Sequence, residues 1–168
     1  MTLDDLNRAD RGAFVAALDG VFEHSPWVAE GAYAARPFAS IDALHAAMID
    51  VVRRASPQRQ LALIRAHPEL AGKAAVRREL TSASSAEQSG AGLTTCSPEE
   101  YAQLQALNAR YNAKFGFPFI LAVKGYDRAG VITEFERRVA RSVDEERAES
   151  LRQIARIADL RLRALLQA

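Results

Sequence analysis

The chain has 168 residues, a formal net charge of +1 and a single cysteine. Apolar residues make up 49% and charged residues 26% of it, as in an ordinary globular protein. No run approaches the ~20 apolar residues that cross a bilayer, and the length predicts one domain over residues 1–168. The acidic start lacks the features of a secretory signal, and one cysteine excludes an internal disulfide, so we expect a cytoplasmic protein.

Charge is distributed unevenly along the chain. Residues 57–133 hold nine Lys or Arg against six Asp or Glu, whereas residues 1–56 hold five against eight. This mild basic bias suits a small anionic ligand. It is too weak and too scattered for a nucleic-acid interface, so we expect neither a nucleic acid nor a membrane as partner.

Helix signals recur from the start of the chain. Apolar residues at helical spacing predict amphipathic helices over residues 10–21 and 40–55. A third helix begins at Pro57, a residue favoured at the first helical position. It must end just before His67, because Pro68 disfavours a helical backbone at the residue that precedes it.

The clearest helix start is a capping box between Ser97 and Glu100, with Pro98 at the first helical position. This helix is predicted to run to about Phe115. Gly116 follows, a residue typical of left-handed helix ends.

The longest predicted helix begins at a second capping box, between Ser142 and Glu145. The only plausible strand is a short apolar run over residues 119–123, which periodicity cannot separate from a buried loop. We therefore predict an all-α fold, a compact single-domain bundle of about eight or more helices.

Three histidines and the cysteine are the candidate reactive groups. His24 lies at a helix exit and His45 on a helix surface, and both settings favour structural roles. His67 is the better candidate, since an imidazole with a pKa near 6.5 can take and return a proton at neutral pH; the alternative is that it caps the last carbonyls of its helix. The spacing of the histidines predicts no metal site, and Cys96 has no histidine nearby in sequence, which favours a structural thiol.

A run of small hydroxyl residues precedes Glu87. Ser84 with Glu87, and Ser85 with Gln88, form two overlapping capping boxes. The first amides of a helix also bind anions and carbonyl oxygens. The sequence leaves both uses of this segment open.

Arg161 projects close to the apolar line of Ile154, Ala158 and Leu165, so part of it faces the core. Arginine is costly to bury without a partner. It either meets a carboxylate of the protein or presents its planar guanidinium to a polar ligand.

Four stretches form a recognisable pattern: Ser25-Pro26-Trp27, residues 67–72, residues 84–88 with 91–93, and residues 115–125. Their order and spacing resemble the family of 2-oxo-4-hydroxy-4-carboxy-5-ureidoimidazoline (OHCU) decarboxylases of urate degradation, over about residues 6–165.

The resemblance implies a cofactor-free carboxy-lyase with an all-helical fold, which forms a homodimer and converts a small anionic ureidoimidazoline to (S)-allantoin and CO2. His67 matches the catalytic proton donor of the family. The positions that match its substrate-binding residues are Pro68, Ser84, Ser85, Ala86, Glu87, Gln88, Phe119, Ile120, Leu121, Ala122, Val123 and, as a further ligand contact, Arg161.

Chemistry agrees with this interpretation. The carbon that loses CO2 adjoins a ring C=N bond, so the substrate can accept the electrons itself. The protein must orient the substrate and deliver a proton to one face; we expect His67 to protonate the ring carbon and Glu87 to hold His67 or the substrate in register. Two other interpretations stay open, a ureide hydrolase that uses these two residues to activate water, and a non-catalytic helical binding module.

Overall fold

The computed structural model describes residues 1–72 and 80–166 of the chain. Within these ranges there are no strands, and the prediction of an all-α fold with eight or more helices is confirmed. The elements are α1 (Leu3–Arg8), α2 (Arg11–Ala17), α3 (Trp27–Ala32), the 3-10 helix η1 (Tyr33–Ala35), α4 (Ile41–Arg54), α5 (Pro57–Ala66), α7 (Ser82–Gly90), α8 (Pro98–Phe115), α9 (Arg128–Val139) and α10 (Val143–Leu166).

The residues group into two compact units. The first unit contains Met1–Ala66 and Ile154–Ala168, and the second unit contains His67–Gln153. Helix α10 contributes its first half to the second unit and its second half to the first. The single domain expected over the whole chain stays a prediction.

In the first unit, α3 packs against α4 and α2. Ser40 caps α4 by accepting a hydrogen bond from the Ala43 amide at 3.1 Å, and the helix has the predicted span. The helix expected over residues 10–21 is shorter, because α2 ends at Ala17. The chain turns there, and Gly20 has a φ of 85°, which is incompatible with a right-handed helix.

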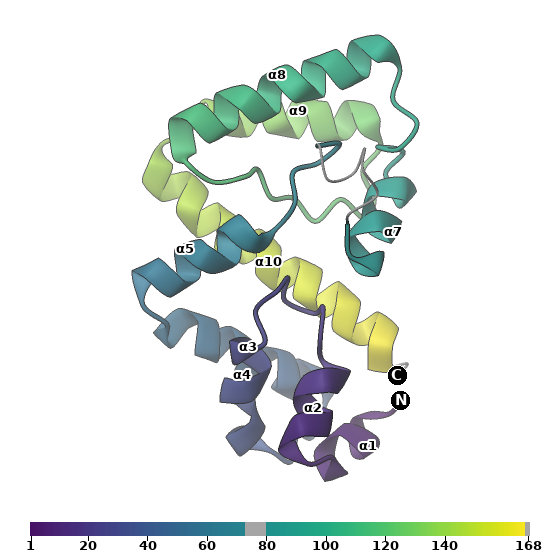
Figure 1. The fold of residues 1–168 in the computed structure, drawn as a ribbon, viewed down its shortest axis with the longest axis vertical. Coiled ribbons are helices and arrows are strands. Elements are labelled where there is room, and N and C mark those ends of the chain that lie inside the picture. The colour runs from purple at the N-terminus through teal and green to yellow at the C-terminus, as the bar shows by residue number, and fades with distance from the viewer. Residues whose placement is uncertain (73–79, 167–168) are drawn as a thin grey trace. The chain divides into compact units, whose positions relative to one another are not determined.

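In the second unit, α8 and α9 lie side by side (Figure 1). The predicted capping box of α8 is present, since Ser97 accepts from the Glu100 amide at 3.1 Å and Glu100 accepts from the Ser97 amide at 3.0 Å. Gly116 ends the helix with a φ of 74°. The second predicted capping box, between Ser142 and Glu145, also forms and begins α10.

An aromatic cluster fills the core of the second unit. Tyr111 of α8 contacts Phe115, Phe117, Phe119 and Phe135, with ring centroids 4.3 to 6.0 Å apart. The rings of Phe119 and Phe135 stack at 3.9 Å. This cluster anchors the chain where it leaves α8 and passes through residues 119–123.

Candidate active site

His67 lies where the sequence places it, directly after the last residue of α5. Only 6% of its surface is exposed. A histidine at a surface helix end would be solvated, whereas this residue is buried. It opens a short irregular loop, residues 67–72.

Amide side chains from two helices hold this loop at Ala71. The Gln88 side chain of α7 accepts from the Ala71 amide at 2.9 Å and donates to the Glu69 carbonyl at 3.3 Å. Gln105 of α8 donates to the Ala71 carbonyl at 2.6 Å. Ala71 has a φ of 49°, a left-handed conformation that costs a residue with a Cβ about 1 kcal/mol. The hydrogen bonds at both of its backbone groups offset that cost and fix the loop.

Further along the same loop, Asn108 of α8 donates to the Leu70 carbonyl at 3.0 Å, and Asn112 donates to the Glu69 carboxylate. A Cβ added at Gly72 would lie 2.7 Å from the Glu69 Cβ, so glycine is required there. The residues that follow His67 are therefore attached to one face of α8 by side chains spaced three and four apart.

Helix α7 carries residues 84–88, but it is capped differently from the prediction. Its N-cap is Thr81, whose hydroxyl accepts from the Ser84 amide at 3.2 Å and whose carbonyl accepts from the Ser85 amide at 2.9 Å. The two capping boxes proposed for this segment are therefore wrong. The helix begins earlier because the hydroxyl and the carbonyl of Thr81 both accept from amides of its first turn.

This register decides what residues 84–88 can offer a ligand. Ser84 and Gln88 are buried, Glu87 is half-buried, and Ser85 and Ala86 are exposed. The amides of the segment are already bonded to Thr81 or lie within the helix. The segment can therefore contact a ligand through side chains.

Residues 119–123 form a buried apolar segment outside any helix, each residue between 1% and 4% exposed. Their backbone groups are held individually. Arg138 of α9 donates to the Ile120 carbonyl at 2.5 Å, and the Ala122 amide donates to the Gln153 side chain of α10 at 2.9 Å. The segment is apolar and buried, as expected of the apolar wall, and its contact with a ligand stays a prediction.

Arg161 belongs to the first unit, whereas the other predicted site residues belong to the second. Its guanidinium donates to the Glu23 carboxylate at 3.0 Å and to the Gly20 carbonyl at 2.7 Å. The side chain faces inward as predicted, with 9% of the residue exposed. The sequence left two possible partners for Arg161, a carboxylate of the protein and a polar ligand. The structure contains the first of them, Glu23.

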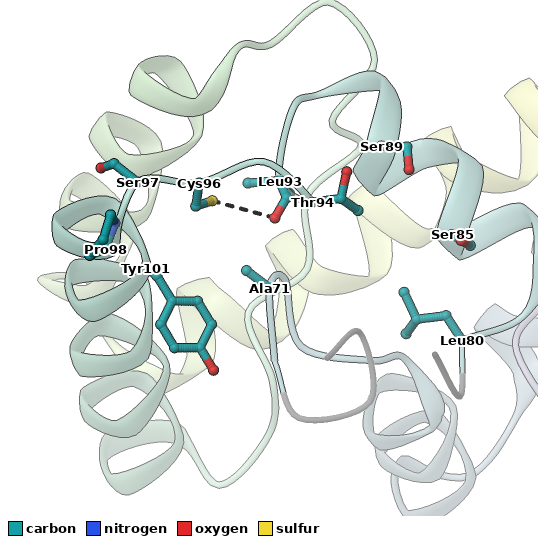
Figure 2. A pocket seen from close by; sticks show the side chains of 10 residues that line it. All are labelled: Ala71, Leu80, Ser85, Ser89, Leu93, Thr94, Cys96, Ser97, Pro98 and Tyr101. Carbon is teal, nitrogen blue, oxygen red and sulfur yellow. Dashed lines mark hydrogen bonds between the residues drawn. The ribbon is translucent and has the colours of Figure 1, made fainter. Parts of the chain in front are cut away.

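A cavity of about 690 Å³ opens in the second unit beside α7 (Figure 2). Its lining includes Ser85 from the predicted site, but none of the other predicted ligand contacts. The lining residues are Ala71, Leu80, Ser85, Ser89, Leu93, Thr94, Cys96, Ser97, Pro98 and Tyr101. The cavity therefore adjoins the His67 loop at Ala71 without containing the histidine.

The thiol of Cys96 faces this cavity and donates to the Leu93 carbonyl at 3.4 Å, as the dashed line in Figure 2 marks. Burial raises the pKa of the thiol above its ordinary value, and the Glu100 carboxylate raises it further. A nucleophilic cysteine needs the opposite shift. The environment agrees with the structural role favoured for Cys96.

The other two histidines lie in the first unit. His24 is exposed, with a φ of 47°, and His45 contacts the Ala155 carbonyl at 2.7 Å. In residues 1–72 and 80–166, no three His, Cys, Asp or Glu side chains gather as a metal site would require. No helix in these ranges is long and apolar enough to cross a membrane.

Comparison with known proteins reveals relatives over nearly the whole chain. The sequence model of the OHCU decarboxylase family matches residues 7–163. The 2-oxo-4-hydroxy-4-carboxy-5-ureidoimidazoline decarboxylase of Haloferax volcanii is 44% identical over 96% of this chain and 94% of its own. The enzyme of the same name from Halalkalicoccus jeotgali is 44% identical over 98% of this chain and 92% of its own.

The crystal structure of an (S)-allantoin synthase has the same fold, with a TM-score of 0.79 and 28% identity over 99% of this chain. The present chain spans 54%, about half, of the chain in that structure. Fold and relatives together define a helical lyase of the decarboxylase type. The chain belongs to the OHCU decarboxylase family.

Proposed function

We propose that the protein decarboxylates 2-oxo-4-hydroxy-4-carboxy-5-ureidoimidazoline to (S)-allantoin and CO2 during urate degradation, with His67 as the stereospecific proton donor. Family membership supports the reaction, because relatives at 44% identity carry the name of this decarboxylase. The observation that carries the role of His67 is its burial at a helix end, in a loop held through Glu69, Leu70 and Ala71.

The reaction needs no external electron sink. When the carboxylate leaves as CO2, its bonding electrons pass into the adjoining C=N bond of the ring, and an enol-like intermediate results. The protein has to hold the substrate, stabilise that intermediate and supply one proton to one face of the ring carbon. A buried imidazole at the start of a held loop meets the last requirement, and no cofactor has a part in this scheme.

The remaining site residues have supporting roles in the proposal. Glu87, half-buried on α7, keeps His67 or the substrate in register. Pro68, with residues 84–88 and 119–123, contacts the substrate, and the apolar wall favours conversion of a charged carboxylate to a neutral gas. Arg161 is the further ligand contact, and its bond to Glu23 would orient the guanidinium for that role. By family resemblance we also propose a cytoplasmic homodimer.

The test is turnover of substrate generated in place from urate by urate oxidase and hydroxyisourate hydrolase, followed by circular dichroism. The substrate also decays unaided to racemic allantoin, so the chirality of the product reports catalysis. Wild-type protein is expected to give (S)-allantoin rapidly. His67→Asn is expected to lower the rate about a hundredfold or more, as for loss of a general acid.

His24→Asn is the matched control. It makes the same chemical change at an exposed histidine whose left-handed backbone asparagine tolerates, and it is expected to keep the wild-type rate. Release of ammonia or urea in place of CO2 would identify a hydrolase. Racemic product at the spontaneous rate from folded wild-type protein would leave a binding module.

A further inference from the structure

The second unit contains an ion pair that is completely shielded from solvent. The Arg138 and Glu146 side chains are 0% exposed, and Arg138 Nε donates to Glu146 Oε1 at 2.8 Å. The Tyr111 hydroxyl donates to the same carboxylate oxygen at 2.6 Å. Burial, followed by this hydrogen bond, raises the pKa of Tyr111 well above its ordinary value, so the phenol stays a donor.

Stability alone is a poor reason for such a pair. Desolvation of both ions offsets much of their attraction, and apolar replacements of buried pairs are often neutral or stabilising. In addition, Nη2 of Arg138 has no hydrogen-bond partner among the residues that the structure describes. The guanidinium is therefore retained at this position for hydrogen bonds that an apolar side chain could not form.

The guanidinium contacts the apolar wall, residues 119–123. Arg138 Nη1 donates to the Ile120 carbonyl at 2.5 Å, and the guanidinium carbon lies 4.4 Å from the centroid of the Phe119 ring. Glu146, which also accepts from Tyr111, holds the guanidinium at Nε. A rigid, fully buried group thus holds the peptide between residues 120 and 121 in one orientation.

A second side chain holds the same segment two residues later. Gln153 accepts from the Ala122 amide at 2.9 Å, while its own amide donates to Glu149 at 2.8 Å. Within the described ranges, the amides of Phe119, Ile120, Leu121 and Val123 have no acceptor, and those of Leu121 and Val123 flank the held Ala122 amide. Buried amides require an acceptor, and the carbonyl and carboxylate oxygens of a ureidoimidazoline provide it.

We propose that Arg138 and Gln153 are positioning residues, which fix the backbone of residues 119–123 so that the amides of Leu121 and Val123 face the substrate. This inference rests on the proposed function. Neither positioning residue touches the substrate. Loss of either side chain's contact allows residues 119–123 to rotate. Substrate binding is then weaker, and the substrate ring is held less firmly relative to the proton donor His67.

Arg138→Lys tests the first contact, because lysine keeps the charge but cannot bond Glu146 and the Ile120 carbonyl with one planar group. We expect KM to rise about tenfold, as for the loss of hydrogen bonds worth roughly 1.4 kcal/mol. The enantiomeric excess of allantoin is also expected to fall. Enzyme concentrations are adjusted to equal initial rates, so that racemic background is the same in every sample.

Arg141→Lys is the matched control, because Arg141 also bonds Glu146, at 3.3 Å, and within the described part of the chain it forms its ion pairs with Glu145, Glu146 and Glu149, not with residues 119–123. It is expected to keep the wild-type KM and enantiomeric excess. A merely structural defect lowers the active fraction of the enzyme, which changes neither quantity. Equal effects of the two substitutions would overturn the proposal.

Gln153→Met tests the second contact and decides the question if Arg138→Lys does not fold. It removes the acceptor of the Ala122 amide with little change in volume, and it is expected to raise KM and lower the enantiomeric excess. Arg152→Met is its control, since Arg152 bonds the same Glu149 at 2.7 Å from an exposed position. Wild-type values for both Gln153→Met and Arg138→Lys refute the positioning role alone, whereas racemic product from wild-type protein refutes the proposed function.

Discussion

At the scale of single residues, the environment of Cys96 predicts its reactivity. Burial and the Glu100 carboxylate raise the pKa of its thiol, and the thiolate is the form that reacts. We therefore expect iodoacetamide at pH 8 to alkylate Cys96 more slowly than it alkylates glutathione, as followed by mass spectrometry. Cys96→Ser is expected to keep wild-type turnover. Alkylation as fast as that of glutathione, with loss of turnover in Cys96→Ser, would assign the thiol a part in the chemistry.

Residue environments follow from the sequence where neighbours along the chain decide them. Pro68 alone sets the helix end at His67, and helical spacing alone turns Arg161 inward. The partner of Arg161 could not be predicted, because Glu23 lies 138 positions away and spacing carries no information about such contacts. Helical spacing also sets Arg138 on the buried face of α9, a signal that could have marked it.

At the scale of elements, the start of α8 makes stability depend on pH. The backbone hydrogen bond from Ser97 holds the pKa of Glu100 below its ordinary value, and Arg128 lowers it as well. Because the folded pKa is depressed, the stabilisation is complete above the ordinary pKa of about 4.3. It is lost as the pH falls through the lower folded value.

The measurement compares the free energies of unfolding of wild type and Glu100→Gln in urea between pH 7 and pH 3. We expect wild type to be the more stable at pH 7 and the difference to shrink below about pH 4.3. Glu99→Gln is the control, because it removes the same charge from the same turn at an exposed position. The same pH dependence in both variants would show that helix charge, and not the capping contact, is responsible.

Helices whose ends carry clear capping residues were predictable from the sequence, and helices with weak or competing signals were not. Helix α8 has a capping box and a C-terminal glycine, and its predicted bounds are confirmed. Helix α9 has an Asp127 cap but continues through glycine and β-branched residues, whose helix propensity is low, so its sequence pattern is weak. The start of α7 was misplaced because four hydroxyl residues, Thr81, Ser82, Ser84 and Ser85, lie close together there, and any of them is a candidate cap; Thr81 is the one that caps the helix.

At the scale of the whole molecule, the chain order and the two compact units do not coincide. The first unit is completed by Ile154–Ala168, which comes after the entire second unit. Sequence spacing placed residues 67–72, 84–88 and 119–123 on separate elements. It could not reveal that these three segments fall in one unit and Arg161 in the other, because contacts between distant residues form only on folding.

The ion pair between Glu23 and Arg161 closes the first unit across 138 residues. Since the two side chains are 1% and 7% exposed, removing either partner leaves a buried charge, and we expect Glu23→Gln or Arg161→Met to cost about 3 to 5 kcal/mol. The double variant should lose less than the sum, by about 0.5 to 3 kcal/mol. Urea unfolding followed by the fluorescence of Trp27, which reports the same unit, measures all three.

An exposed pair supplies the control for this double-mutant cycle. Arg163 and Asp42 join the same two parts of the first unit, but their side chains are 49% and 78% exposed, so Asp42→Asn is expected to cost less than about 1 kcal/mol. Strict additivity of Glu23→Gln and Arg161→Met would show that the pair does not close the unit. Arg161 would then be retained for the substrate, and its replacement should lower turnover whatever it costs in stability.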